Sequence, residues 1–471
     1  MSDEPQQSVQ PQTAPYLPEP AINKISDWIG AEVDAADFPQ TKLRFRNDRA
    51  AATVGLSGLS NAEWAQHFGR FEPLQGNLPK PLALKYHGHQ FRNYNPDIGD
   101  GRGFLFAQMR SVEGRLLDLG TKGSGTTPYS RSGDGRLTLK GAVREILATE
   151  MLEALGVNTS KTFSVIETGE ALERGDEPSP TRSAVMVRLS HSHIRIGSFQ
   201  RLLAYEQKAE MDALIDYCLT NFPGPTPPGG ALAREEPAIV LMHQVVERMA
   251  DLAASYMVAG FVHGVLNTDN MNVTGESFDY GPWRWLPRWE PGFTAAYFDH
   301  AGLYAFGRQP EAIHWNCGQF AVALRLVADS EPLIAALERF GPLYMEAIAR
   351  RWCWRLGIVP RSLEEDSQLI SACEKSMRET GVQPDAFFFN HRGGKHAEGE
   401  LAELLSQYDQ IEDTHSYWTE DAPQTMVIEE VEEIWSAIDQ RDDWQPLNDK
   451  VTALRRMGDA HGAPPVPSGH S

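Results

Sequence analysis

The stretch HGVLNTDNM at residues 263–271, with the DYG that begins at Asp279, decides how the fold of this chain is predicted. Asn270 and Asp279 carry hard oxygen ligands of the kind that Mg²⁺ prefers in proteins. Val265 stands two positions after His263, and its aliphatic side chain cannot accept a proton. The stretch therefore contains a predicted metal site, but the residue two positions after its histidine cannot act as a base.

This spacing resembles the catalytic loop of protein kinases, H-x-D-x-x-x-x-N, and the D-F-G that follows it. His263, Asn270 and Asp279 keep the spacing, whereas Val265 replaces the catalytic aspartate of a kinase. The nearest other acid is Asp269, which can accept a hydroxyl proton from a different direction. Alternatively, Asp269 is a helix cap or a turn residue. The spacing alone does not decide between these two roles.

The residues before this stretch predict a β-rich part of the chain with one helix. Five short apolar segments are typical of strands: 82–86, 104–109, 115–122, 162–167 and 183–189. Residues 137–155 place apolar side chains at helical spacing, and Gly156 supplies a stop signal. A glycine-rich turn at 95–103 precedes the second strand, and Lys122 ends the third. This is the order of elements in a kinase small lobe.

The second half of the chain is predicted to be helical after a proline-rich loop at 221–230. From Leu241 to Tyr256, apolar residues repeat at steps of three and four, as in a helix that packs into a core. Further helical patterns occur at 318–328, 332–355, 362–380, 397–408 and 425–440. We predict an α+β, protein-kinase-like two-lobed fold: a small β-rich lobe with one key helix, a larger helical lobe and a helical C-terminal extension.

Composition and pattern divide the chain into six predicted parts. They are a disordered N-terminal tail (1–20), an N-terminal region with the kinase-like small lobe and nucleotide-binding loops (21–220), a Pro/Gly-rich loop (221–235), a kinase-like large lobe with the metal and catalytic loop (236–395), an acidic helical extension (396–456) and a disordered tail (457–471).

Two copies of G-D-G-R flank the predicted strand that ends in Lys122. Glycines let a backbone approach phosphate oxygens closely and point its N–H groups at them, and an arginine adds a bidentate donor. The pattern favours phosphate binding over two ordinary tight turns. The candidate residues are Gly99, Gly101, Arg102, Lys122, Asp134 and Gly135.

Three further charged residues fit the same site. Glu145 lies on the predicted helix, where a kinase places the glutamate that pairs with its strand lysine, here Lys122. Arg188 and Arg195 are seven residues apart and can hold a terminal phosphate. Surface salt bridges are the alternative for these two arginines, and the spacing leaves it open.

The net charge of −21 is unevenly distributed. Residues 398–443 carry fifteen Asp and Glu and a single Arg, so nucleic-acid binding is disfavoured for the chain as a whole. This acidic stretch is either a solvated helical face or a contact for a partner. Residues 99–201 are rich in Arg, Lys and Gly, which suggests a small bound polyanion.

The sequence predicts neither a membrane protein nor a disulfide-stabilised one. It has no apolar run near the roughly 20 residues that span a bilayer and no signal-peptide pattern, so we expect a cytoplasmic protein. Its four cysteines, none in a C-x-x-C pair, are expected to be buried thiols: Cys218, Cys317, Cys353 and Cys373.

Several segments in one order identify a family resemblance. The segments are GDGRG (99–103), KGSGTTPYSRSGDGR (122–136), REILATEMLEALGV (144–157), VRLSHSHIRIGSF (187–199) and HGVLNTDNMNV (263–273) with its DYGP. They resemble the selenoprotein O family, also called the YdiU family. That resemblance implies a kinase-like fold without the kinase aspartate. It also implies transfer of AMP from ATP, bound inverted, to hydroxyl groups of proteins.

The resemblance implies a role for each matched residue. Asp269 matches the proton acceptor, and Asn270 and Asp279 match ligands of Mg²⁺ or Mn²⁺. Arg188 and Arg195 match the pair lining the pocket that the inverted phosphates enter. The G-D-G-R residues and Lys122 match nucleotide contacts. The expected partners are ATP and proteins with Ser, Thr or Tyr hydroxyls, and a monomer is expected.

The chain departs from the family in its cysteines. Members commonly carry a cysteine soon after DYGP and a redox-active cysteine or selenocysteine near the C-terminus, but no cysteine follows Cys373 here. Redox control through such a pair is therefore not expected. Two other functions stay open: an ATP-dependent kinase that uses Asp269 as base, and a non-catalytic nucleotide-binding pseudokinase scaffold with the acidic stretch as its docking surface.

Overall fold

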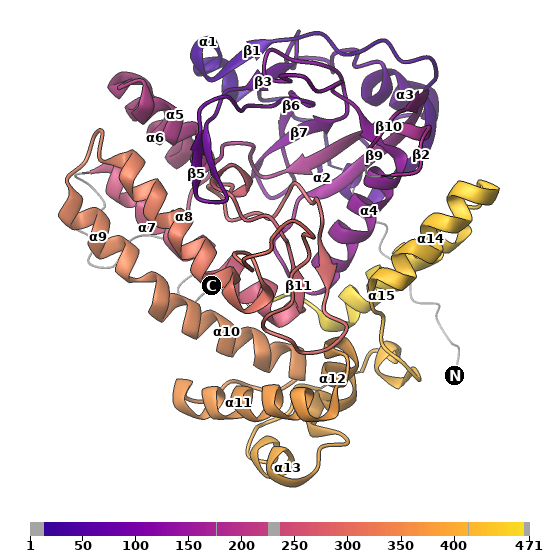
Figure 1. Ribbon diagram of the computed structural model, residues 1–471, viewed down its shortest axis with the longest axis vertical. Helices are drawn as coiled ribbons and strands as arrows, with labels where there is room; N and C mark the ends of the chain where they lie inside the picture. The colour runs from indigo at the N-terminus through magenta and orange to yellow at the C-terminus, as the bar shows by residue number, and fades with distance from the viewer. Residues whose placement is uncertain (1–13, 176, 225–235, 413, 466–471) are drawn as a thin grey trace, which may run out of the picture.

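The computed structural model describes residues 14–175, 177–224, 236–412 and 414–465. A twisted antiparallel sheet fills one end of the molecule, at the top of Figure 1, and helices form the other end. The fold is thus α+β with a β-sheet lobe and a helical region, as predicted at this level of detail. No helix in the described ranges is long and apolar enough to cross a membrane.

The sheet contains every strand that the sequence predicted and three that it did not: the two edge strands β1 and β2, and the two-residue strand β8. The order is β1-β3-β6-β7-β10-β9-β2, with β8 paired to β10. The bounds are β1 Gly30–Glu32, β2 Lys42–Arg46, β3 Leu82–Leu84, β6 Leu105–Arg110, β7 Leu116–Lys122, β8 Leu137–Thr138, β9 Lys161–Leu172 and β10 Thr181–Ser190. Both edges come from the N-terminal segment, where strands of three and five residues give little pattern to recognise.

Apolar side chains cover both faces of the sheet. On β10, Val185 and Val187 face one core cluster, whereas Met186 between them faces the other, because alternate residues of a strand point to opposite faces. The first cluster is closed by α2 (Asp48–Thr53) and α3 (Asn61–Gly69), whose Trp64 stacks on Phe163. The second is closed by α4 (Leu139–Ala154), the helix predicted at 137–155.

The helical region is built around α7 (Pro237–Ala259), which ends at Gly260 in the left-handed conformation. In the described ranges, four helices pack on it: α6 Lys208–Asn221, α8 Gln309–Leu324, α9 Ser330–Glu338 and α10 Phe340–Leu356. The others pack on these: α5 Ile196–Ala204 on α6 and α8, α11 Leu363–Thr380 and α12 Pro384–His391 on α10, and α13 Gly399–Leu405 on α11. The single helix predicted at 332–355 is two helices, α9 and α10. Because α5 and α6 pack on α8 and α7, the helical part begins near residue 196, not at the predicted 236.

The C-terminal extension packs back onto the sheet lobe. Helices α14 (Ile428–Arg441) and α15 (Gln445–His461) both contact α4. Arg455 of α15 is bidentate to Glu150 of α4, and Asp442 accepts hydrogen bonds from Lys42, Arg44 and Arg182. Part of the acidic stretch is therefore neutralised by basic side chains of the same chain.

Parts of both predicted disordered tails are ordered in the described structure. At the N-terminal end, Glu19 is ion-paired to Arg110 of β6 at 2.7 Å, so residues 14–20 are packed on the sheet. At the C-terminal end, α15 continues to His461, past the predicted helix limit at 456. Residues 1–13 and 466–471 of these tails, and 225–235 of the predicted loop, lie outside the described residues. All four cysteines are buried free thiols, as predicted.

Candidate active site

A cleft of about 680 Å³ lies where the glycine-rich loops of the sheet lobe meet the loop at 263–281. It is lined by almost all residues that the sequence singled out: Gly99, Gly101, Arg102, Lys122, Asp134, Gly135, Arg188, Arg195, Asp269 and Asp279. Glu145 and Asn270 lie behind this lining and hold residues that form it. Segments nearly 200 residues apart in the sequence thus build one site.

Lys122 at the end of β7 is held between two carboxylates. Its ammonium pairs with Glu145 of α4 and lies 3.0 Å from Asp279. Lys122 and Glu145 are 5% and 2% exposed, so the pair is buried. The predicted pairing is confirmed, and the surface alternative for Glu145 is wrong, because α4 turns this face toward the sheet.

Asp279 is the point on which the cationic side chains converge. Besides Lys122, Arg188 and Arg195 approach its carboxylate to 3.6 and 3.9 Å. Burial alone would raise the pKa of Asp279, but Lys122, the two arginines and Arg102 hold it well below the usual value. Asp279 is therefore a carboxylate, and its φ of 65° places it in the left-handed region, which an L-residue seldom adopts without a structural demand.

Arg188 and Arg195 both have buried nitrogens without a hydrogen-bond partner in the described structure. Among the described residues, no partner accepts a hydrogen bond from Nε or Nη1 of Arg188, or from Nε of Arg195, although these atoms are buried. The other nitrogens of Arg195 bond to the Asp100 carboxylate and to the Asp269 carbonyl, both at 3.0 Å. Unpaired buried donors are costly, so they indicate a site for an anion that supplies acceptors. This excludes the surface salt-bridge alternative.

Asp269 lies in the short 3₁₀ helix Thr268–Asn270 and faces the cleft. Its Oδ1 is buried and accepts no hydrogen bond from the described residues, while Oδ2 is 3.4 Å from Nε2 of Gln90. Burial raises the pKa of Asp269 to about 6, against the opposing effect of Arg195. The cap position of this short helix is occupied by Asn267, and the Asp269 side chain caps no helix in the described structure. The alternative role of Asp269 as a helix cap is therefore wrong.

The backbone around Asp269 is built to admit its carboxylate. A Cβ on Gly88, in the hairpin of β4 (Gly88–Gln90) and β5 (Asn93–Asn95), would lie 2.8 Å from Oδ1 of Asp269. The same hairpin is fastened to the loop by the hydrogen bonds from His89 N–H to Thr268 and from Phe91 N–H to Asn267. None of the predicted site residues belongs to this hairpin.

Asn270 and Asp279 are close enough to share one metal ion. The Asn270 amide lies 3.3 Å from Oδ2 of Asp279, and exchanging the amide's O and N would present a second oxygen ligand. No group of three or more His, Cys, Asp or Glu side chains among the described residues could hold a metal by itself. The pair fits Mg²⁺, which commonly takes one or two protein ligands and fills its octahedron with phosphate oxygens and water.

The two glycine-rich loops pack against each other. Thr127 donates a hydrogen bond of 2.6 Å to the Asp100 carbonyl, and a Cβ on Gly99 would lie 2.6 Å from the ring of Tyr129. The side chain of Asp134 pairs with Arg174 at 2.8 Å. Arg174, from the β9–β10 connection, also lines the cleft, and the sequence pointed to it only as part of a basic region.

His263 holds the two loops together instead of facing the cleft. It is buried, and its Nε2 lies 3.2 Å from the carbonyl of Phe278, the residue before Asp279. Val265 does not line the cleft that contains Asp269. The motif's histidine is thus structural, and its valine lies outside the lining.

Comparison with known proteins gives one consistent result. The sequence model of the family described as "Protein adenylyltransferase SelO" matches residues 14–407. Proteins named "Protein nucleotidyltransferase YdiU" are similar to the chain: that of Synechocystis sp. is 41% identical over 482 residues, which span 94% of this chain and 99% of the relative. The protein of Gloeobacter violaceus is 42% identical over 93% and 95% of the two chains. That of Vibrio vulnificus is 36% identical over 66% and 61%.

Proposed function

The chain belongs to the SelO family of protein adenylyltransferases, and from this membership we propose that it transfers AMP from ATP to hydroxyl side chains of proteins and releases pyrophosphate. The proposed acceptors are Ser, Thr or Tyr residues. We further propose that the fold is kinase-like. In a kinase, too, a strand lysine pairs with a glutamate of the next helix, and a later loop carries the metal-binding asparagine and aspartate; here these are Lys122 with Glu145, and Asn270 with Asp279.

The observation that carries this proposal is the free oxygen of Asp269. In a kinase the base stands two positions after the histidine, but here that residue is Val265, which lies outside the cleft lining. The carboxylate that borders the cleft and has no partner for Oδ1 is Asp269. A base at a different place suits a nucleotide in a different orientation, with its α-phosphate toward Asp269.

In the proposed step, the acceptor hydroxyl loses its proton to Asp269 as its oxygen bonds to the α-phosphorus. The bond from that phosphorus to the bridging oxygen of the β-phosphate breaks, and pyrophosphate leaves with the electron pair. The positive side chains of Lys122, Arg188 and Arg195 stabilise the charge of the leaving group, and the free donors of the two arginines need anionic acceptors.

Asn270 and Asp279 would hold Mg²⁺ or Mn²⁺ beside the phosphates. A divalent ion there would neutralise phosphate charge and help to align the phosphate chain. The chain's own contribution is to keep Asp279 ionised, which Lys122 and the arginines do.

The test is transfer from ATP labelled at one phosphate at a time, with a mixture of proteins and with the chain itself as acceptors. Label from the α-phosphate that becomes covalently attached to protein supports the proposal. Label from the γ-phosphate alone would instead make the chain a kinase that uses Asp269. ATP binding without any transfer, under Mg²⁺ and under Mn²⁺, would make it a scaffold.

A further inference from the structure

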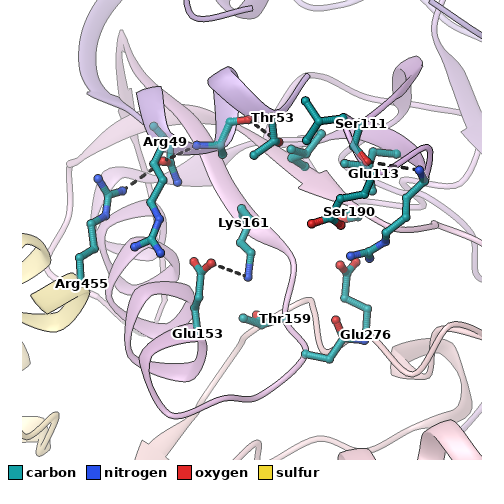
Figure 2. A pocket seen from close by; sticks show the side chains of 17 residues that line it. Arg49, Thr53, Ser111, Glu113, Glu153, Thr159, Lys161, Ser190, Glu276 and Arg455 are labelled. Atoms are coloured by element: carbon teal, nitrogen blue, oxygen red, sulfur yellow. Dashed lines mark hydrogen bonds and ion pairs between the residues drawn. The ribbon is translucent and has the colours of Figure 1, made fainter. Parts of the chain in front are cut away.

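A second cavity, of about 220 Å³, lies at the end of β10, beside the turn between β6 and β7. Arg188 lines the cleft, whereas the next two residues of the same strand, Leu189 and Ser190, line the second cavity. Its walls come from α2, the β6–β7 turn, the end of α4, the start of β9, Glu276 of the helical region and Arg455 of α15 (Figure 2). We name it the back cavity.

The back cavity contains a carboxylate without a cationic partner and a hydroxyl without a hydrogen-bond partner among the described residues. Glu276 is 5% exposed, and among the described residues no Lys, Arg or His nitrogen comes within 4.0 Å of its carboxylate. One of its oxygens accepts the His191 N–H at 2.8 Å. Ser190 is 1% exposed, and its hydroxyl has no partner in the described structure. In Figure 2, neither residue has a dashed line to another residue drawn, whereas Lys161 is joined to Glu153.

An arginine without an ion pair to any described residue lies at the rim of the same cavity. Arg115, in the turn between β6 and β7, is exposed, and the structure shows no ion pair for its guanidinium with any described residue. The other basic side chains of the lining are engaged: Lys161 with Glu153 at 3.1 Å, Arg455 with Glu150, and Arg49 with Asp459 at 3.5 Å. One buried carboxylate (Glu276), one buried hydroxyl (Ser190) and one exposed guanidinium (Arg115) therefore remain for a ligand, besides the exposed carboxylate of Glu113 at the turn.

From this arrangement we propose that the back cavity binds a small zwitterion, an α-amino acid, with its ammonium group on Glu276 and its carboxylate on Arg115. The Ser190 hydroxyl supplies a further hydrogen bond. Ala50, Leu117 and Leu189 form an apolar wall for the side chain.

Size and charge favour a small zwitterion over the other ligand classes. The cavity is smaller than the roughly 300–1,000 Å³ of pockets for drug-sized ligands, so a nucleotide does not fit. A zwitterion engages both Glu276 and Arg115, whereas a simple anion or a simple cation engages only one of them. Burial also raises the pKa of Glu276 to about 7, which a bound ammonium group would offset.

The floor of the back cavity is bonded to the loop that carries Asp279. The Asn158 carbonyl accepts the Ser277 N–H at 2.8 Å, and the hydroxyls of Thr159 and Tyr280 lie 2.6 Å apart. Tyr280 directly follows Asp279, the metal ligand. A ligand on Glu276 therefore contacts the segment that sets the position of Asp279, and we expect its binding to change the affinity of the cleft for nucleotide.

The test is calorimetric titration of the full chain, without ATP, with each proteinogenic L-amino acid in turn. We expect saturable binding of at least one, and weaker binding of its amine without the carboxylate and of its acid without the ammonium group. Arg115→Gln and Glu276→Gln should each weaken binding about 10–100-fold, as for hydrogen bonds to charged groups. Glu113→Gln, an exposed carboxylate on the same turn, is the matched control and should bind normally.

Two results would overturn the proposal: no amino acid binds the wild-type chain, or Arg115→Gln and Glu276→Gln both bind like wild type. Arg115 is exposed, so its variant remains informative even if Glu276→Gln does not fold. In a second titration with a non-hydrolysable ATP analogue, a saturating amino acid should shift the affinity about fivefold or more. An unchanged affinity would overturn the coupling. Both titrations are independent of which group the enzyme transfers.

Discussion

Two buried arginines, one in each half of the molecule, show how the same residue serves structure or function. Arg351 of α10 is 4% exposed, and each of its side-chain nitrogens has a partner: Nε and Nη2 bond to Asp251 at 3.0 and 2.6 Å, and Nη1 bonds to the Gly156 carbonyl at 2.9 Å. Arg188 of β10 is 5% exposed, yet its Nε and Nη1 have no partner in the described structure. A satisfied buried charge belongs to the fold, whereas an unsatisfied one indicates a missing ligand.

The distinction between satisfied and unsatisfied buried groups also applies to the carboxylates of the cleft, where Oδ1 of Asp269 has no partner in the described structure. The substitution Asp269→Asn tests it and has the largest expected effect. The amide keeps the size of the side chain but cannot accept a proton, so transfer should fall about 10²–10⁴-fold, as for the loss of a general base. Nucleotide affinity, measured by calorimetry, should stay close to that of wild type. Transfer that continues at the normal rate would remove Asp269 from the mechanism.

Arg188→Met should separate function from stability in the cleft. We expect transfer to fall about 10²–10³-fold, the effect of losing a preorganised donor to developing charge. The melting temperature should hold or rise, because Asp279 keeps Lys122 at 3.0 Å and two unpaired donors disappear. A clear loss of thermal stability with normal transfer would mean that Arg188 is a structural residue.

Arg351→Met is the matched variant in the helical half and should show the opposite result. Removing it leaves the Asp251 carboxylate, which is 20% exposed, without its bidentate partner. We expect a loss of roughly 2–3 kcal/mol in the free energy of unfolding, less than for a fully buried pair. Denaturant unfolding measures this loss. Nucleotide affinity of the folded fraction should not change, and a change would show that the two halves are coupled through α10.

Val265→Asp should have the smallest effect. Position 265 lies outside the cleft lining, so a new carboxylate there has no reacting hydroxyl to serve if ATP is inverted. We expect no transfer of label from γ-labelled ATP. Gain of γ-phosphate transfer in this variant, together with normal activity of Asp269→Asn, would identify the chain as a kinase that lost one residue.

Much of the site could be predicted because its chemistry is local in sequence. The spacing of Asn270 and Asp279, and the order of Lys122 and Glu145, are properties of short segments, and the structure brings each pair together. Arg174 could not be predicted, because it reaches the cleft through the β9–β10 connection. Gln90 could not either, since only the β4–β5 hairpin places it beside Asp269.

The sequence by itself determined the five central strands of the sheet, the helices α4 and α7 and the residue types of the cleft, because periodicity and motif spacing are properties of the chain itself. Only the tertiary structure decided which charges are satisfied. Arg188 has buried nitrogens without a partner, whereas every side-chain nitrogen of Arg351 has one, and this difference depends on neighbours far away in the sequence. The same is true of Glu276, whose carboxylate accepts a hydrogen bond from a residue 85 positions away. Hydrogen-bond satisfaction is a property of packing, and packing joins segments whose contacts no local pattern encodes.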